Sequence, residues 1–379
     1  MTAETVLSNA RIVLANEIVE GSLVLRDGFI AGIDAGGSRS GEDMGGDYVI
    51  PGLVELHTDH LEGHYAPRPK VRWNPIAAVL AHDAQVATAG ITTVLDALRV
   101  GMDEDADLTL ADIRKLADAI EDSVAQDRLR ADHFLHLRCE VSAPDCLQAF
   151  ADFDRDDRVK LASLMDHAPG QRQFVNLETY AYYYQRKLKL TDRDFKLFCE
   201  KRMAESARYS APNRAVIAAA CRERGIVLAS HDDATSGHVD EAIEQGVRVA
   251  EFPTTEEAAR ASKAAGLGVL MGAPNVMRGA SHSGNVSARA LAGDGLLDIL
   301  SSDYIPFSLI QSAFFLGDMV EGISLPQAVA MVSKNPAEAV GLTDRGVIEQ
   351  GRRADLVRVR VDDHVPVVRT VWRQGRRVA

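Results

Sequence analysis

The stretch Tyr48–Leu56, with the sequence YVIPGLVEL, is an apolar run followed at once by His57-Thr58-Asp59-His60. A short apolar run of this kind is typical of a strand buried on both faces of a parallel sheet. Residues two apart in an extended segment share a face, so His57 and Asp59 point the same way. The stretch therefore predicts a buried strand whose C-terminal end carries chemically active side chains.

The same pattern recurs along the middle of the chain. Further apolar or β-branched runs are Ile91–Ala97, His133–Val141, Lys160–Met165, Gly225–Ser230, Arg248–Phe252, Gly266–Gly272 and Leu297–Ser302. Most are separated by amphipathic segments, which are Ala77–Ala89, Leu108–Gln126, Asn213–Arg224, Val239–Gln245 and Glu256–Ala265. This alternation predicts an α/β protein with a parallel sheet. Eight such units over roughly 250–300 residues have the size of a TIM (β/α)8 barrel, with a doubly wound open sheet as the alternative.

The two ends of the chain are rich in strands instead. Val6–Leu14 and Ile18–Leu25 are followed by the hairpin signal Asp27-Gly28, and Asp355–Val361 and Val365–Val371 lie near the other end. Chain termini often lie close in space. We therefore expect residues 1–50 and 343–379 to form one small β-sandwich domain beside a barrel domain of residues 51–342.

One segment, Gln171–Pro212, interrupts this alternation. It is too long for a simple loop, and Tyr180–Lys189 within it is rich in tyrosine and basic residues. Long insertions after barrel strands commonly form active-site lids or interfaces. For the Tyr180–Lys189 cluster we favour an amphipathic helix that packs at an interface.

Composition excludes several classes of protein. The 379 residues carry 42 Lys plus Arg against 55 Asp plus Glu, a net charge of −13, which argues against a non-specific nucleic-acid binder. No apolar run approaches the roughly 18 residues that cross a membrane, and no signal peptide is recognisable. The 4 cysteines form no C-x-x-C pair, so we expect reduced thiols in a cytoplasmic protein.

Histidine and acidic residues fall where the predicted strands end. The strand-end positions are His57 and Asp59, Glu140, Asp166 and His167, His231 to Asp233, and Asp303. In a TIM barrel these positions converge on the C-terminal face. Taken alone, each has a structural explanation, such as a carboxylate at a helix N-terminus for Asp232. Together they indicate a site for Zn²⁺, Mn²⁺ or Fe²⁺, and a shared carboxylate would make it binuclear.

Three motifs resemble those of the amidohydrolase superfamily. They are Pro51–His57 (PGLVELH), Ser333–Ala337 (SKNPA) and Gly351–Leu356 (GRRADL). The resemblance implies a distorted TIM barrel, one or two divalent metal ions and a flanking β-sandwich. That layout is the one expected from the strand and helix pattern.

Longer motifs resemble one branch of that superfamily, the triphosphate diphosphatases of bacterial phosphonate breakdown. They include Leu135–Glu140, Ser163–His167, Gly170–Gln173, Ala229–Thr235, Glu251–Thr255, Met271–Asn275 and Ser281–Val286. The resemblance implies metal-dependent hydrolysis of alpha-D-ribose 1-methylphosphonate 5-triphosphate to the 5-phosphate and diphosphate, just upstream of the carbon–phosphorus lyase. The substrate partner is then a phosphorylated ribose.

The resemblance also implies metal-binding roles for individual residues. His57 and Asp59 would bind one metal ion, Glu140 would bridge two, and His167 and His231 would bind the second. Asp303 would bind metal and act as the general base. The superfamily usually has His-x-His on the first strand, so His60 is an alternative to Asp59. Zn²⁺ is the expected ion, with Mn²⁺ and Fe²⁺ as alternatives.

Candidate phosphate ligands are Arg172, Arg278, His282 and Ser283. Phosphate sites after strands seven and eight are common in barrels, and the last three residues follow strand seven. For the two arginines a surface salt bridge is the alternative. By analogy with similar acidic barrels we also expect a homo-oligomer.

Two other functions stay open. The fold hosts many chemistries, so a cyclic amide or an N-acyl small molecule is an alternative substrate. A non-catalytic subunit of the phosphonate-cleaving machinery is a further alternative, against which the intact ligand set argues. The negative net charge does not exclude a triphosphate, because bound divalent ions would reverse the sign of the charge locally.

Overall fold

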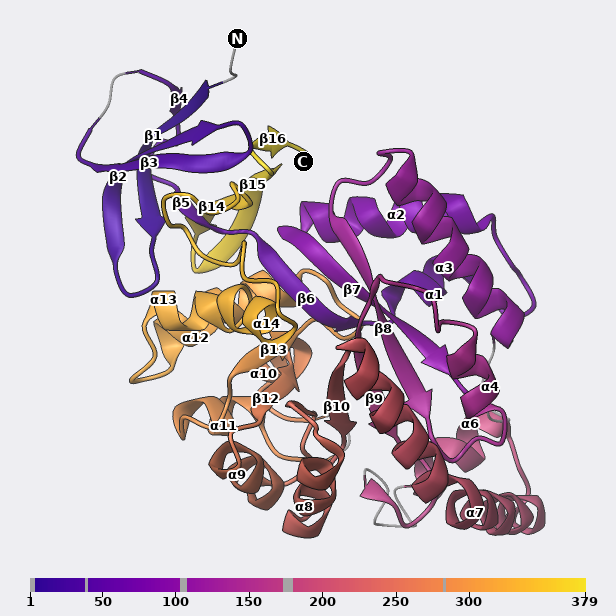
Figure 1. Ribbon diagram of the computed structural model, residues 1–379. Helices are drawn as coiled ribbons and strands as arrows, with labels where there is room; N and C mark the ends of the chain where they lie inside the picture. The colour runs from indigo at the N-terminus through magenta and orange to yellow at the C-terminus, as the bar shows by residue number, and fades with distance from the viewer. Residues whose placement is uncertain (1–3, 38–39, 103–107, 173–179, 282–283) are drawn as a thin grey trace.

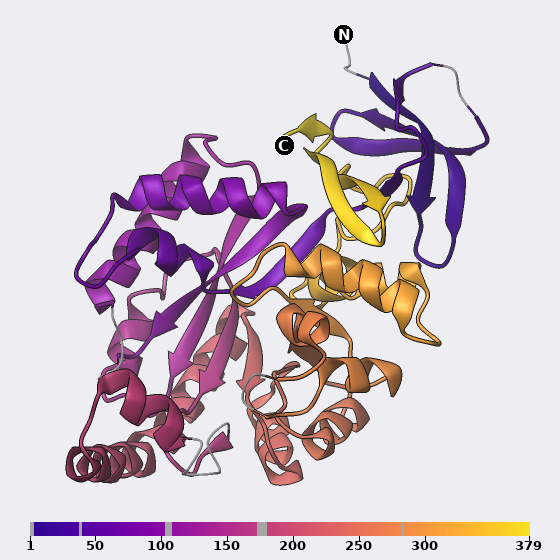
Figure 2. The same ribbon diagram turned by 180° about the vertical axis from the view of Figure 1, so that it is seen from behind.

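The computed structural model describes residues 4–37, 40–102, 108–172, 180–281 and 284–379. The chain forms two sheets, a barrel of parallel strands surrounded by helices and a smaller sheet built from both ends of the chain (Figure 1). Seen from behind, the strands from both ends of the chain again lie side by side, next to the barrel (Figure 2). No helix in the described ranges is long and apolar enough to span a membrane.

The barrel strands lie in sequence order around the sheet, and every neighbouring pair is parallel. They are β6 (Leu53–Thr58), β7 (Ile91–Val100), β8 (Asp132–Glu140), β9 (Val159–Met165), β10 (Val227–His231), β11 (Val249–Glu251), β12 (Gly268–Gly272) and β13 (Ile299–Ser301). Each of the eight predicted runs contains or overlaps one of these strands. The TIM-barrel prediction is therefore confirmed, and the open doubly wound sheet is wrong.

Polar contacts close the barrel between its first and last strands. Asp303 forms an isolated parallel bridge with Thr58, and its backbone N–H donates to the carbonyl of His57 at 3.1 Å. The buried carboxylate of Glu55 accepts from the backbone N–H groups of His57 at 2.7 Å and Ser302 at 2.6 Å. A side chain thus replaces part of the backbone ladder at this seam.

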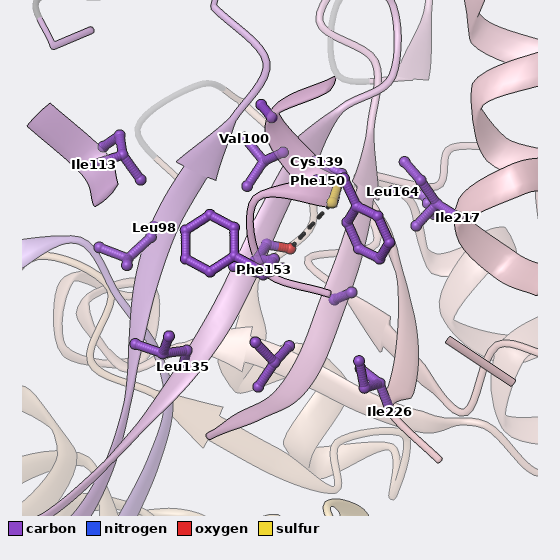
Figure 3. Close-up of a cluster of buried hydrophobic side chains, with 14 of the residues drawn as sticks. Leu98, Val100, Ile113, Leu135, Cys139, Phe150, Phe153, Leu164, Ile217 and Ile226 are labelled. Atoms are coloured by element: carbon purple, nitrogen blue, oxygen red, sulfur yellow. Dashed lines mark hydrogen bonds between the residues drawn. The ribbon is translucent and has the colours of Figure 1, made fainter. Parts of the chain in front are cut away.

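Helices cover the outside of the barrel. They are α1 (His60–Tyr65), α2 (Pro75–Thr88), α3 (Leu110–Ala125), α4 (Cys146–Ala151), α6 (Arg186–Leu188), α7 (Asp192–Arg224), α8 (Ser236–Gln245), α9 (Glu256–Ala264), α10 (Ala273–Arg278), α11 (Ala288–Gly293), α12 (Ser308–Met319), α13 (Leu325–Ala330) and α14 (Lys334–Ala339), with the π-helix η2 (Ala181–Gln185). Outward-facing residues of β7 to β9 pack against them in a buried apolar cluster that includes Leu98, Leu135, Phe150 and Ile217 (Figure 3).

The insertion ends differently from the prediction. Its second half belongs to α7, which runs without a break through Pro212, although the sequence suggested a boundary there. One proline removes a single intrahelical hydrogen bond, and the rest of this 33-residue helix compensates for that loss. Tyr180 and Tyr184 pack with Phe198 in a small core of their own.

The smaller sheet has the order β16-β15-β14-β5-β1-β2-β3, with β4 paired to β1. Its strands are β1 (Glu4–Val13), β2 (Ile18–Arg26), β3 (Phe29–Ala35), β4 (Glu42–Asp43), β5 (Tyr48–Pro51), β14 (Leu356–Asp362), β15 (Val365–Arg373) and β16 (Arg376–Arg377). Antiparallel pairing of β5 with β14 joins the chain ends, as expected. Leu7, Leu23, Leu356 and Trp372 share one core, so the sheet packs onto itself.

A buried charged network holds α2 against β7 and β8. His133 Nδ1 lies 2.8 Å from Asp96 and its Nε2 lies 3.4 Å from Asp83. Burial alone would lower the pKa of His133, but the two carboxylates raise it to about 9. The imidazolium therefore stabilises the fold at neutral pH.

We expect this network to make the stability of the protein depend on pH. Because the pKa of His133 is raised in the folded state, its contribution is complete below about pH 6.5 and is lost as the pH rises through about 9. His133→Gln should lower the free energy of unfolding at pH 7 by on the order of 2 kcal/mol, and by much less at pH 10. Chemical unfolding at several pH values measures this. His364→Gln, at an exposed histidine, is the control, and parallel pH curves for His133→Gln and wild type would contradict the expectation.

Candidate metal centre

Six strand ends carry the candidate centre. His57 lies in β6, Glu140 ends β8, His167 follows β9, His231 ends β10, Glu251 ends β11 and Asp303 follows β13. All are at the C-terminal ends of parallel strands, so they converge on one face of the barrel. His231 and Glu251 are also paired in register on neighbouring strands, which places their side chains side by side.

Glu251 is the hub of the centre. Its carboxylate lies 3.1 Å from His57 Nδ1 and 3.1 Å from His231 Nδ1, and it accepts from Ser163 Oγ at 2.5 Å. Burial raises the pKa of Glu251, but His57, His136 and His231 hold it well below the usual range. An ionised Glu251 makes each imidazole donate through Nδ1, which leaves each Nε2 as the candidate ligand atom for a metal ion.

The π faces of the two imidazoles held by Glu251 also meet. The rings of His57 and His231 stack with centroids 5.7 Å apart and an interplanar angle of 22°. Phe252 packs edge-on against both rings, at 5.0 and 5.3 Å. This packing fixes the ring orientations that the hydrogen bonds select.

Glu140 orients the next histidine in the same manner. One of its oxygens lies 2.6 Å from His167 Nδ1, and the other accepts from Ser142 Oγ at 2.7 Å. Burial raises the pKa of Glu140, but the neighbouring His167, Arg99 and Arg202 outweigh that effect and lower it. The carboxylate is therefore ionised at neutral pH.

Asp232 completes a cluster with His167 and His231. Its Oδ2 lies 3.8 Å from His167 Nε2 and 3.4 Å from His231 Nε2, and within the described ranges it is buried without a hydrogen-bond partner. One ligand atom from each of the three residues lies within 4.8 Å of the others. A buried carboxylate oxygen that faces two imidazole nitrogens is a donor set suited to Zn²⁺ or a similar ion. The residues present therefore fit a divalent metal.

The charge balance of the cluster also favours a cation. Burial would lower the pKa of His231, but Asp232 and Glu251 raise it. The negative potential that retains a proton on this imidazole would equally attract a metal ion.

Asp303 lies beside this cluster with an unusual backbone. Its φ is 56°, and the strand-end residues Asp232 and Phe252 have φ values of 58° and 52°. Such left-handed conformations cost energy for residues other than glycine and concentrate at functional sites. Burial is the main cause that raises the pKa of Asp303, against opposing effects of His57 and His231.

The structure places Asp59 and His60, the two alternative ligands of the first barrel strand, in different surroundings. Asp59 stands at the start of α1, where its carboxylate lies 3.3 Å from Arg138 Nη1. His60 points elsewhere, with its Nε2 2.8 Å from Gln85 Oε1. The negative charge of Asp59 also helps to raise the pKa of Asp303. The geometry therefore favours Asp59 over His60 as the ligand in this centre.

The structure describes two of the four predicted phosphate ligands. Arg172 is buried and paired with Asp233 and Glu241, which neutralise its charge. Arg278 is exposed at the end of α10. His282 and Ser283 lie outside the described residues.

Sequence reasoning missed several residues of the centre. Asp232 is among the predicted strand-end positions but has no assigned ligand role, and Glu251 lies in a quoted motif without a role. Arg99 and Arg202 approach Glu140 at 3.6 and 3.8 Å. The signal for Glu251 was available, because it ends the sixth predicted strand just as His231 ends the fifth.

Comparison with known proteins shows the family to which the chain belongs. A sequence model of the Amidohydrolase family matches residues 84–379, and the chain belongs to this family. A deacetylase for N-acetyl-D-glucosamine-6-phosphate from Mycobacterium smegmatis shares the fold, with a TM-score of 0.66 over 99% of both chains at 16% identity.

One relative is much more similar. The chain is 50% identical over 377 residues to alpha-D-ribose 1-methylphosphonate 5-triphosphate diphosphatase of Escherichia coli (strain K12), covering 98% of this chain and 100% of that protein. It is 25% identical over 393 residues to imidazolonepropionase of Deinococcus deserti, covering 95% of this chain and 92% of that protein.

We expect Glu251→Gln to weaken metal binding. The two imidazoles donate to different oxygens of Glu251, but a glutamine has only one accepting oxygen and no charge. His57 and His231 therefore lose their fixed orientation. Loss of such an orienting partner typically costs about 10- to 100-fold in metal affinity. A competition titration with a chelating dye measures the affinity, and Glu244→Gln on the exposed face of α8 is the control. Equal affinities for the Glu251 variant and wild type would refute the hub role.

Proposed function

We propose that this protein hydrolyses alpha-D-ribose 1-methylphosphonate 5-triphosphate to the 5-phosphate and diphosphate in phosphonate degradation. The observation that carries the proposal is the 50% identity, over nearly the full length of both chains, to the diphosphatase of Escherichia coli. Water is added and the anhydride link between the α and β phosphorus atoms breaks. The products are a phosphate monoester and diphosphate.

The arginines around the centre support a polyanionic substrate. Arg138 lies 3.3 Å from Asp59, and Arg99 and Arg202 lie within 4 Å of Glu140. Fixed cations beside metal ligands are suited to neutralising the charge of a triphosphate and of its transition state.

The centre supplies the candidate ligands for one or two ions. In this proposal His57, Asp59, Glu140, His167, His231 and Asp303 hold the metal, with Asp232 added to the set. Imidazole and carboxylate donors suit Zn²⁺ best, and Mn²⁺ or Fe²⁺ also fit. When bound, such ions supply a water activated at neutral pH and positive charge for the phosphoryl oxygens.

Asp303 is the proposed general base. Its carboxylate accepts the proton of the attacking water and holds that water beside the phosphorus. Burial raises the pKa of Asp303, which makes it a stronger base than an exposed aspartate. Glu251 acts through the histidines that it orients, Glu140 both holds metal and orients His167, and Arg172, Arg278, His282 and Ser283 remain candidate contacts to the phosphates.

The amide-hydrolysis alternative has one supporting observation. The 25% identical relative is an imidazolonepropionase. Assays with a cyclic amide and with the triphosphate, on the same metal-loaded preparation, separate the two functions. Faster turnover of the amide would overturn the proposal.

The proposal also covers the cellular location and the oligomeric state of the protein. The 4 cysteines are all free and 3 are buried, which supports the reducing cytoplasm. Leu197, Met203 and Val216 expose apolar side chains on α7, which supports a homo-oligomer. We include no nucleic-acid or membrane partner. Light scattering of the purified protein measures the oligomeric state, and a monomer would overturn that part.

The direct test follows the products by phosphorus NMR. Metal-loaded protein and the ribose triphosphate should give the 5-phosphate ester and diphosphate in equal amounts. Release of inorganic monophosphate, or no turnover, would overturn the proposed function.

Asp303→Asn should lower kcat by about 10²- to 10⁴-fold, because the amide cannot take the proton from water. Metal content measured on the same sample separates loss of the base from loss of the ion. Asp294→Asn, at an exposed aspartate paired with Arg260, is the control. Activity of Asp303→Asn within about twofold of wild type would exclude the general-base role.

A further inference from the structure

Three histidines gather outside the barrel, between α1 and α2. His60 and His64 are four residues apart on α1, and His82 lies on α2. Their ring centroids are 5.0 Å apart for His60 and His64, and 6.2 Å from each of these to His82. In the described part of the chain their side chains bond to Gln85 and Asp96 and not to Glu251, Glu140 or Asp232, so the cluster is separate from the candidate metal centre.

Two of these imidazoles converge on a single atom. Gln85 Oε1 lies 2.8 Å from His60 Nε2 and 3.2 Å from His64 Nε2. Residues four apart on a helix lie on one face, which is why both rings reach the same point on α2. Two imidazole nitrogens and an amide oxygen that meet in this way form three potential ligands of one ion.

His82 offers a fourth potential ligand for the ion. It is fully buried, and its Nε2 lies 2.8 Å from Asp96 Oδ1, so Nε2 donates to the carboxylate. Its Nδ1 is buried and has no hydrogen-bond partner among the residues that the structure describes. A buried polar nitrogen without a partner is costly in a folded protein. A carboxylate behind an imidazole is also the usual support of a metal-binding histidine.

The carboxylate of Asp96 also contacts His133. Its other oxygen lies 2.8 Å from His133 Nδ1, and His133 Nε2 faces Asp83. Both nitrogens of His133 are thus taken up by carboxylates, so this residue supports the cluster and offers no nitrogen to a metal. The lone pair that stays available belongs to His82.

We propose that His60, His64 and His82, together with the amide oxygen of Gln85, bind a divalent transition-metal ion that is distinct from the ions of the candidate metal centre. Three imidazoles favour Zn²⁺, Co²⁺, Ni²⁺ or Cu²⁺ over Mg²⁺ and Ca²⁺, which require oxygen ligands. The ion ties α1 to α2 and to the wall of the barrel at β7. Because α1 follows Asp59 directly, this tie fixes the segment that carries a ligand of the catalytic ions.

Counting bound ions tests the proposal without any activity measurement. Protein stripped with a chelator is reloaded with Zn²⁺, desalted, and analysed for metal per chain by mass spectrometry. His64→Gln should bind one ion fewer than wild type. His364→Gln, an exposed histidine in the β14–β15 turn, should bind the same number as wild type. Equal ion counts for His64→Gln and wild type would overturn the proposal.

Two further variants test the proposed site independently of the first count. In a His231→Ala background, which disrupts the candidate metal centre, adding His64→Gln should still remove one ion, and no further loss would overturn the proposal. Gln85→Glu replaces the amide oxygen with a carboxylate and should tighten Zn²⁺ binding at this site several-fold in a competition titration. Unchanged or weaker binding in a folded Gln85→Glu protein would likewise count against a metal between α1 and α2.

Discussion

A carboxylate buried inside the barrel, that of Glu251, is the constraint on which the candidate centre depends. An ionised group without contact with water must be compensated by nearby donors. Here the donors are His57 from the first barrel strand, His231 from the fifth and Ser163 from the fourth. Satisfying one negative charge therefore fixes the orientation of two imidazoles, whose rings also stack on each other. Their Nδ1 atoms face the carboxylate, which leaves their Nε2 atoms as the candidate ligand atoms.

The seam between β6 and β13 depends on a second buried carboxylate. Glu55 accepts hydrogen bonds from the backbone N–H groups of His57 and Ser302. His57 is a candidate metal ligand, and Ser302 precedes the proposed general base Asp303. Burial raises the pKa of Glu55 to about 8 despite these bonds. The barrel thus closes through the same residues that form its site, and a change in either affects the other.

Local charge and net charge differ in this protein. The chain carries a net charge of −13, which governs solubility and long-range steering. At the centre, Arg99, Arg138 and Arg202 surround the acidic ligands, and bound divalent ions would add positive charge. A polyanionic substrate is therefore compatible with an acidic protein.

The sequence predicted the barrel because every buried strand is a short apolar run between polar boundaries. It also predicted that His57, Glu140 and His231 lie at the C-terminal ends of barrel strands, because each lies at or directly after the end of such a run. It could not predict the pairing of Arg172 with Asp233 and Glu241, because ion pairs between distant segments leave no local signal. The separation of Asp59 from His60 depends on where the strand ends and α1 begins, a boundary that periodicity locates only within a few residues.

Anomalous X-ray diffraction at the zinc edge, on crystals of the metal-loaded protein, tests the central claim most directly. The account predicts one or two anomalous peaks within coordination distance of His57, His167 and His231, with Glu251 behind the imidazoles and outside the coordination sphere. A protein that is active on the triphosphate but shows no peak among these residues would contradict it, as would direct coordination of the ion by Glu251 in place of the histidines.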